Sequence, residues 1–296
     1  MIQKHIAAIE LVIECDTAYE IFDQNPVSKD FFNTKNIPDS DHQVHIRLCA
    51  GDAPCINKTN LQFQADHSWS IYKNTHFIDI VFHPPAFKNS LWIARFDNNF
   101  EKGVIYCSEQ KITRQAGRPV ISNPVVYPLD QILLMHILSR IGGMIIHAAG
   151  WEYNNSGWIF AGKSGAGKST ITNLITKRGY GQILSDDRMI VRKHSNDFLM
   201  YGTPWPGDAG YALNQSAPLK GVFFLSQGTE NHINELKPSD AVSGLMPVVS
   251  IPWYDRDKVE QMMTFCDSLM GNIPMYQLTF KPDEPVVDML MEFVNE

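Results

Sequence analysis

Short hydrophobic runs separated by turn-forming residues dominate the first 125 residues. The runs either alternate with polar residues or are rich in β-branched residues, which is typical of strands. They cover Ile9–Cys15, Gln43–Cys49, Thr59–Ala65, Phe77–Phe82, Leu91–Phe96 and Gly103–Cys107. The turn-forming clusters lie at Asn33–Asp41, Cys49–Pro54, Pro84–Pro85 and Asp97–Asn98. This pattern predicts a β-rich N-terminal region over residues 1–125, a place for substrate or partner recognition.

The pattern changes at a helical segment. From Leu129 to Ile141 hydrophobic residues recur close to the helical period, and Gly142-Gly143 ends the run. Strands are then predicted at Met144–Ala149, Gly157–Ala161, Ile183–Ser185, Met189–Arg192, Phe198–Tyr201, Val222–Leu225 and Met275–Phe280. Helices are predicted at Ser169–Arg178, Pro238–Met246, Arg256–Met270 and Glu284–Val294. Alternating strands and helices predict an α/β fold whose core domain spans residues 126–296.

The strongest chemical signal lies between one predicted strand and the helix that follows it. Residues 162–169 read Gly-Lys-Ser-Gly-Ala-Gly-Lys-Ser, a full match to the phosphate-loop pattern GxxxxGK[ST]. Glycines let the backbone N–H groups surround phosphate oxygens, and the helix N-terminus adds positive potential. We expect a nucleoside triphosphate to bind at Gly162, Lys163, Ser164, Gly165, Ala166, Gly167, Lys168, Ser169 and Thr170. Lys168 would reach the β- and γ-phosphates, and the Ser169 hydroxyl would bind Mg²⁺.

Two adjacent carboxylates follow this loop at a distance that suits phosphoryl transfer. Asp186 and Asp187 come after the predicted strand Ile183–Ser185. One carboxylate can hold Mg²⁺ while the other accepts the proton of an incoming hydroxyl. We expect Asp186 to be the base and Asp187 a metal ligand, although the order of the two roles stays open. Asp208, in a segment rich in Gly and Pro, is a further candidate ligand for Mg²⁺.

These motifs together resemble a known kinase family. The phosphate loop followed by Ser185-Asp186-Asp187 is similar to the C-terminal catalytic domain of HPr kinase/phosphorylase, which shares its nucleotide-binding core with phosphoenolpyruvate carboxykinase. The likeness is closest to the HPr-kinase-related proteins found with peptide-modification systems. In those proteins the pattern also includes His-Ala-Ala and Gly-Thr-Pro-Trp, which stand here at His147–Ala149 and Gly202–Trp205. The resemblance covers roughly residues 130–296.

The resemblance implies a fold, an activity and further site residues. It implies a phosphate-loop core like that of HPr kinase and phosphoenolpyruvate carboxykinase, with His147 in the active site, and a homo-oligomer like the ring-shaped assemblies of the family. The family's signature for dephosphorylation is not found; Gly202–Asp208 stands in its place. The reverse phosphorylase reaction is therefore not expected, and neither is HPr as the substrate.

Two functions remain open at this point. In the first, the protein is an ATP-dependent kinase that transfers the γ-phosphate to a serine-like hydroxyl of a peptide or small protein. In that reaction Asp186, Lys168 and His147 would be catalytic, and Ser169, Asp187 and Asp208 would hold the metal. In the second, the protein is a nucleotide-gated binding protein with slow or no phosphotransfer. A carboxykinase is a poor fit, since the chain is short and shows no recognisable transition-metal set.

Composition narrows the partners and the compartment. A formal net charge of -7 argues against a nucleic-acid binder, which needs a basic face. The five cysteines form no CxxC pair, and the N-terminus lacks the features of a signal peptide. No hydrophobic run reaches the roughly 18 residues of a membrane span. We therefore expect a cytoplasmic protein that binds neither membranes nor nucleic acid.

Overall fold

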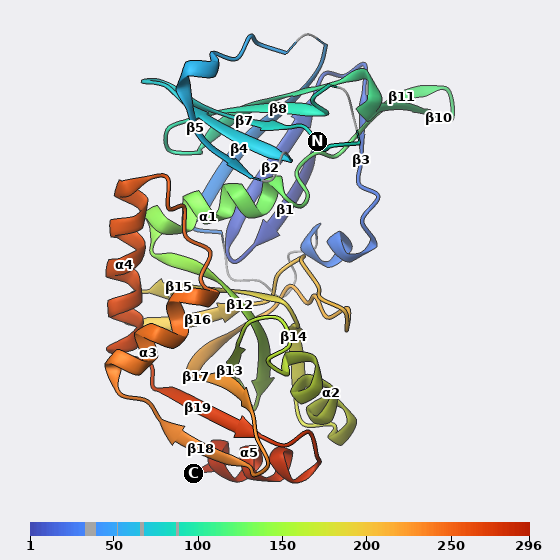
Figure 1. Cartoon of the computed structure of the whole chain (residues 1–296). Helices are drawn as coiled ribbons and strands as arrows, with labels where there is room; N and C mark the ends of the chain where they lie inside the picture. Colours follow the sequence, from blue (N-terminus) through green and yellow to red (C-terminus); the bar gives the residue numbers. More distant parts are fainter. Residues whose placement is uncertain (33–39, 52, 66–67, 87–88) are drawn as a thin grey trace. The chain divides into compact units, whose positions relative to one another are not determined.

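The chain forms two compact units, Met1–Ile137 and Leu138–Glu296. The computed structural model describes residues 1–32, 40–51, 53–65, 68–86 and 89–296 (Figure 1). Most of the turn predicted at Asn33–Asp41 and one residue of the turn at Cys49–Pro54 lie outside this part. The division falls inside helix α1 (Leu129–Ile141), whereas the sequence placed this whole helix in the second domain.

A large mixed sheet forms the body of unit 1. Its order is β1 (Ile2–Ile6), β2 (Ile9–Cys15), β4 (His42–Ala50), β9 (Lys102–Cys107), β8 (Trp92–Asp97), β7 (Phe77–Phe82), β6 (Trp69–Lys73) and β5 (Leu61–Ala65). Strands β2, β4 and β9 are parallel to one another, and the other neighbours are antiparallel. A second sheet joins β10 (Ile112–Gln115), β11 (Arg118–Ser122) and β3 (Glu20–Phe22). The six strands predicted from the sequence are confirmed.

The alternation that predicted these strands has a direct structural cause. In β4 the side chains of Val44, Ile46 and Leu48 are buried, while those of His45 and Arg47 are exposed. One face of the strand therefore packs into the core, and the other face meets water.

An ion pair explains why most of α1 belongs to unit 1. Lys4 in β1 donates to the Asp130 carboxylate at 2.8 Å and to the Val125 carbonyl at 3.2 Å. The Lys4 and Asp130 side chains are each only 1% exposed. Farther along the helix, the His136 ring stacks on Phe100, with ring centroids 4.6 Å apart. These contacts fix the helix to strand β1 and to the turn between β8 and β9.

Two long strands organise unit 2. The strands are β12 (Gly143–Tyr153), β13 (Ser156–Ala161), β14 (Gln182–Ser185), β15 (Arg188–His194), β16 (Asp197–Tyr201), β17 (Ser216–Gln227), β18 (His232–Glu235) and β19 (Met275–Phe280). The first half of β12 pairs with β15, and its second half pairs with β13 and β14. Strand β17 pairs first with β16 and then lies parallel to both β13 and β19. The polypeptide that leads into the phosphate loop thus runs through the middle of the sheet.

Helices cover both faces of the sheet around β13. They are α2 (Lys168–Arg178), α3 (Pro238–Leu245), α4 (Arg256–Met270) and α5 (Pro285–Asn295), and Figure 1 shows α4 and α2 on opposite sides of these strands. Ile159 packs in the cluster that includes side chains of α3 and α4. The next residue, Phe160, packs in the cluster that includes side chains of α2 and α5. A strand buried on both faces reads as a continuous hydrophobic run, as this one does.

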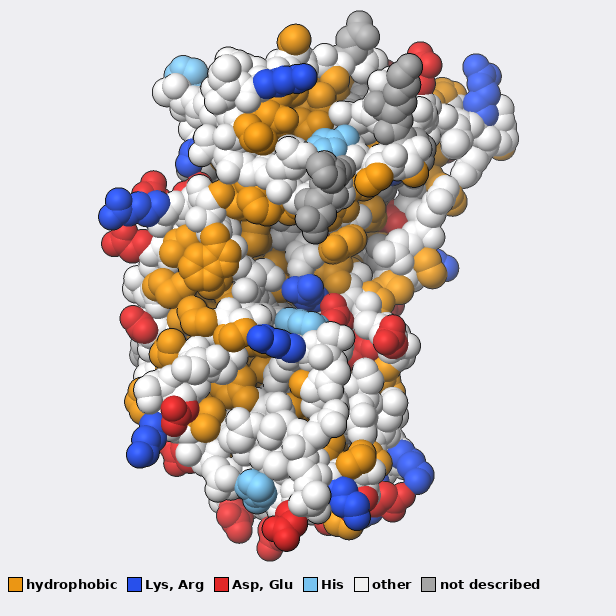
Figure 2. All heavy atoms as spheres, viewed as in Figure 1, with side chains coloured by type: hydrophobic (Ala, Val, Ile, Leu, Met, Phe, Trp, Pro, Cys, Tyr) orange, Lys and Arg blue, Asp and Glu red, His pale blue; other side chains and the backbone are white. Residues whose placement is uncertain are grey.

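The outer surface of unit 2 mixes charges of both signs. Lys177 pairs with Glu284 at 2.6 Å, and Arg178 pairs with Asp288, so α2 and α5 are linked by exposed ion pairs. Figure 2 shows acidic and basic side chains interspersed on the face that it draws. Within the described part of the chain, no helix combines the length and hydrophobicity that crossing a membrane requires.

Candidate phosphate-binding site

The phosphate-loop sequence forms a tight turn between β13 and α2. Strand β13 ends at Ala161 and the helix begins at Lys168. Gly165 and Gly167 have φ angles of +82° and +107°, a backbone conformation that side-chain-bearing residues rarely adopt. At Gly167 a Cβ atom would also come within 2.7 Å of the Phe280 ring. Glycine is therefore required at this position for two independent reasons.

Lys168 is held over the loop by carbonyl groups. Its Nζ donates to the Gly162 carbonyl at 2.8 Å and to the Lys163 carbonyl at 3.4 Å. The residue is 7% exposed, and burial lowers the pKa of its amine, an effect that the negative charge of Asp187 partly offsets. Next to it, Ser169 and Thr170 are exposed in the first turn of α2. The amine, these hydroxyls and the helix N-terminus provide the positive and polar environment that an anion needs.

A pocket of about 350 Å³ lies in front of this loop. Its lining comes entirely from unit 2: His147, Ser164, Gly165, Gly167, Lys168, Ser169, Thr170, Asp186, Asp187, Gly207, Asp208 and Gln227. The structure thus brings together nearly all residues that the sequence singled out. Gly162, Lys163 and Ala166 are not among its lining residues. Gly207 and Gln227 line the pocket without having been predicted.

Asp187 is held by two side chains. His147 Nε2 lies 2.9 Å from Asp187 Oδ1, and Arg188 Nε lies 3.3 Å from Asp187 Oδ2. The hydrogen bond from His147 is the main reason why the pKa of Asp187 is lowered, and the positive charges of Arg188 and Lys168 lower it further. The side chain is 33% exposed. Asp187 is therefore an ionised carboxylate that the pocket leaves accessible.

Asp186 has different surroundings. The residue is 3% exposed, and each carboxylate oxygen accepts a backbone N–H. Gly207 donates to Oδ1 at 2.9 Å, and Ala209 donates to Oδ2 at 2.8 Å. Adjacent in sequence, the two aspartates thus differ in their partners: side chains hold Asp187, and the backbone of a distant loop holds Asp186.

Gln227 lies at the end of β17, beside the tip of the phosphate loop. Its Nε2 donates to the Gly165 carbonyl at 3.0 Å. The contact follows from topology, since β17 is the parallel neighbour of β13 and the two strands end on the same side of the sheet. A pair of polar residues, Ser226 and Gln227, that follows the buried run Val222–Leu225 was the signal that could have identified this position.

The residues at the pocket fit magnesium bound together with a nucleotide. Ser169, Asp187 and Asp208 offer one hydroxyl and two carboxylates. Among the residues that the model describes, no group of three or more His, Cys, Asp or Glu side chains is arranged to hold a metal ion by itself. Mg²⁺ typically takes one or two carboxylates and completes its coordination with substrate phosphates and water.

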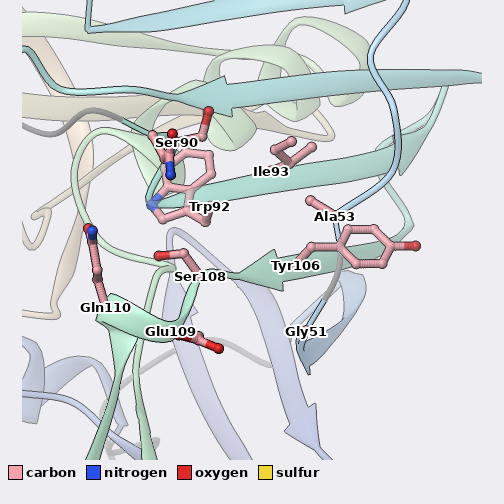
Figure 3. A pocket seen from close by; sticks show the side chains of 10 residues that line it. Gly51, Ala53, Ser90, Trp92, Ile93, Tyr106, Ser108, Glu109 and Gln110 are labelled. Carbon is pink, nitrogen blue, oxygen red and sulfur yellow. The ribbon is translucent and has the colours of Figure 1, made fainter.

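A second pocket lies in unit 1 and has different chemistry. It measures about 380 Å³ and is walled by Trp92, Tyr106 and Ile93, with Ser90, Ser108 and Gln110 among its polar residues (Figure 3). None of the ten described residues that line it is basic, and one, Glu109, is acidic. A polyphosphate needs positive charge or converging N–H donors, so this pocket is not the phosphate site.

Comparisons with known proteins found similarities to the C-terminal part of the chain. A family model described as SynChlorMet cassette protein ScmC matches residues 125–281, which is 157 of the 296 residues. Among solved structures, the Hpr(Ser) kinase/phosphatase from Coxiella burnetii is similar over 51% of this chain and 99% of that chain, with 12% sequence identity and a TM-score of 0.30. That likeness is too weak to carry an argument. No curated protein gives a significant match.

Proposed function

The chain belongs to the family of SynChlorMet cassette protein ScmC, and from this premise we propose that it is an ATP-dependent kinase. In this proposal it transfers the γ-phosphate to a serine-like hydroxyl of a peptide or small protein. One observation carries the proposal: a buried lysine of a phosphate loop and an accessible ionised aspartate line the same pocket. The acceptor class rests on the sequence resemblance to HPr-kinase-related proteins.

The loop side of the pocket supports binding of the triphosphate. Lys168 already points its amine along the loop, where it donates to the Gly162 carbonyl. A phosphate oxygen would replace that carbonyl as the acceptor, a stronger partner because it carries charge. Gly165 and Gly167 keep side chains away from the path of the phosphates. The loop thus provides charge and positioning, which supply most of the catalysis in phosphoryl transfer.

The opposite side supports a proton acceptor at Asp187. The carboxylate is ionised and accessible, and His147 and Arg188 fix its orientation. A low pKa makes this carboxylate a weak base. The transition state of phosphoryl transfer is loose, however, and its formation depends more on the position of the hydroxyl than on a strong base. We therefore give Asp187 the role of holding the acceptor hydroxyl and taking its proton, with His147 as its positioning residue. This assignment exchanges the roles of Asp186 and Asp187 that were expected from the sequence. Asp186 is less accessible than Asp187, because it is buried and both of its carboxylate oxygens accept backbone N–H groups.

The metal ligands in this proposal are Ser169 and Asp208, beside the phosphates. Mg²⁺ bound with the nucleotide would neutralise charge on the β- and γ-phosphates. Both residues line the pocket, and both are exposed.

The decisive experiment follows the γ-phosphate. The protein is mixed with γ-labelled ATP, Mg²⁺ and a library of serine-containing peptides, and label is measured on peptide and as free phosphate. The expected result is label on peptide. Replacing Asp187 by Asn should lower the transfer rate by about 100-fold, the usual contribution of a positioned proton acceptor, and leave nucleotide affinity unchanged. Label that appears only as free phosphate, or not at all, would instead indicate a nucleotide-gated binding protein.

A further inference from the structure

A buried side chain, Asp186, holds the loop that carries Asp208. Gly207 and Ala209 both donate their backbone N–H groups to the Asp186 carboxylate, one to each oxygen. Asp208 is the residue between the two donors. The peptide unit before Gly207 and the peptide unit after Asp208 are both bonded to Asp186, so the short segment Gly207-Asp208 between them is held against this carboxylate.

The close approach of the loop confirms that this contact is tight. A Cβ atom added to Gly207 would lie 3.0 Å from Asp186 Oδ2 and 3.2 Å from the Cβ atom of Asp187. The absence of a side chain at Gly207 therefore lets the backbone come within hydrogen-bonding distance of the carboxylate.

The two ends of the same loop are fixed elsewhere. On one side, the buried Thr203 hydroxyl donates to the Arg188 carbonyl at 2.6 Å. On the other side, Leu213 donates its N–H to the Leu184 carbonyl at 2.8 Å, and Ala212 forms a bridge with Ser185. These contacts hold the beginning and the end of the loop, and the two bonds to Asp186 hold the part next to Asp208.

We propose that Asp186 is a positioning residue that holds Asp208 at the phosphate pocket for binding of the magnesium–nucleotide complex. This inference rests on the proposed function, in which Asp208 is a metal ligand. The carboxylate suits the task because it offers only acceptors, and two N–H donors can each bind one oxygen. An amide in its place would direct its own N–H₂ group at one of these donors and lose that bond.

Binding of a non-hydrolysable ATP analogue in the presence of Mg²⁺, measured by calorimetry, tests the inference without relying on turnover. Asp186→Asn and Asp208→Asn should each weaken binding by about tenfold, as is usual when a residue that orients a metal ligand is lost. The double variant should bind no more weakly than either single variant, because in this proposal both changes remove the same contact, that between Asp208 and the bound Mg²⁺. With EDTA in place of Mg²⁺, all these proteins should bind the analogue equally.

Two controls keep the outcomes apart. Asp288→Asn makes the same chemical change at an exposed ion pair outside the pocket and should keep the magnesium-dependent affinity. Gly207→Ala would place a Cβ atom 3.0 Å from Asp186 Oδ2 in a chain with an intact carboxylate. It should weaken the affinity by no more than the about tenfold expected for Asp186→Asn, and it replaces that variant if Asp186→Asn does not fold. Multiplicative losses in the double variant, or wild-type affinity in Asp186→Asn, would overturn the positioning role. Failure of the wild type to bind any magnesium–nucleotide complex would overturn the proposed function itself.

Discussion

The phosphate pocket of unit 2 and the aromatic pocket of unit 1 are similar in size but differ in the way they could bind a ligand. The pocket in unit 2 measures about 350 Å³, and the pocket in unit 1 about 380 Å³. The first contains Lys168, three aspartates and a glycine-rich turn, whereas the second has aromatic walls and one acidic residue. The volume of a pocket therefore does not tell whether the pocket binds phosphate. Hydrogen-bond donors and positive charges in fixed positions identify a phosphate site, because a polyphosphate gains little from hydrophobic contact.

The two pockets also differ in construction. In unit 2 a single continuous segment, from Ser164 to Thr170, supplies half of the lining. In unit 1 the lining comes from residues next to β4, β8 and β9 that lie far apart in the sequence. A site that takes half of its lining from one segment leaves a motif that can be recognised, whereas a site built from separate strand ends does not.

The largest expected effect separates the two pockets directly. Lys168→Met removes the one lysine in the pocket of unit 2 and should lower phosphotransfer by about 1,000-fold, which corresponds to about 4 kcal/mol of transition-state stabilisation. Steady-state kinetics with γ-labelled ATP measures this loss. The matched control is Tyr106→Phe in unit 1, which should leave turnover and nucleotide affinity unchanged. A strong effect of Tyr106→Phe on nucleotide affinity would contradict the assignment of phosphate binding to unit 2.

Sequence reasoning was effective where local rules apply. Helices α1 and α4 and strand β19 have the predicted bounds, since each combines a clear periodicity with Gly or Pro nearby. The residues of the phosphate loop were identified by spacing alone, and the structure places most of them around one pocket. The six predicted strands of unit 1 were recognised by alternation, although strands such as β1 and β6 were missed.

The features that the sequence did not predict depend on contacts between residues that are far apart in the chain. Strand β1 contains Lys4 and His5, which read as polar surface until the partner of Lys4, Asp130, is known. The difference between Asp186 and Asp187 arises from Gly207 and Ala209, twenty residues or more along the chain. Local patterns cannot reveal such partners. The position of the boundary between the two units, inside α1, was not predicted for the same reason.

The second expected effect tests stability in unit 1 and should leave phosphate binding in unit 2 intact. Lys4→Met removes one partner of a buried ion pair and leaves the Asp130 carboxylate without its cation, which should cost about 3 kcal/mol of unfolding free energy. Urea denaturation measures this loss. The double variant Lys4→Met with Asp130→Leu should recover part of the stability, because an uncompensated charge is then no longer buried. Folded Lys4→Met protein should bind nucleotide with wild-type affinity; weakened binding would show that the two units are coupled.

The smallest expected effect concerns the pH dependence of Asp187. Its pKa in the folded protein is lowered, chiefly by the hydrogen bond from His147, below the ordinary value near 3.9 of an unfolded chain. A carboxylate of this kind stabilises the fold above its unfolded pKa, and the contribution is lost as the pH falls through the folded pKa. The stability difference between wild type and Asp187→Asn should therefore stay constant from pH 7 to 5 and shrink below about pH 4. We expect less than about 1 kcal/mol, since the side chain is 33% exposed and water screens its charge. Urea denaturation of both proteins at several pH values measures the difference, and a difference that does not shrink below about pH 4 would show that the pKa of Asp187 is not lowered. With His147→Gln as the background, the difference should be smaller and its decline complete at a higher pH, because the bond that lowers the pKa is weakened.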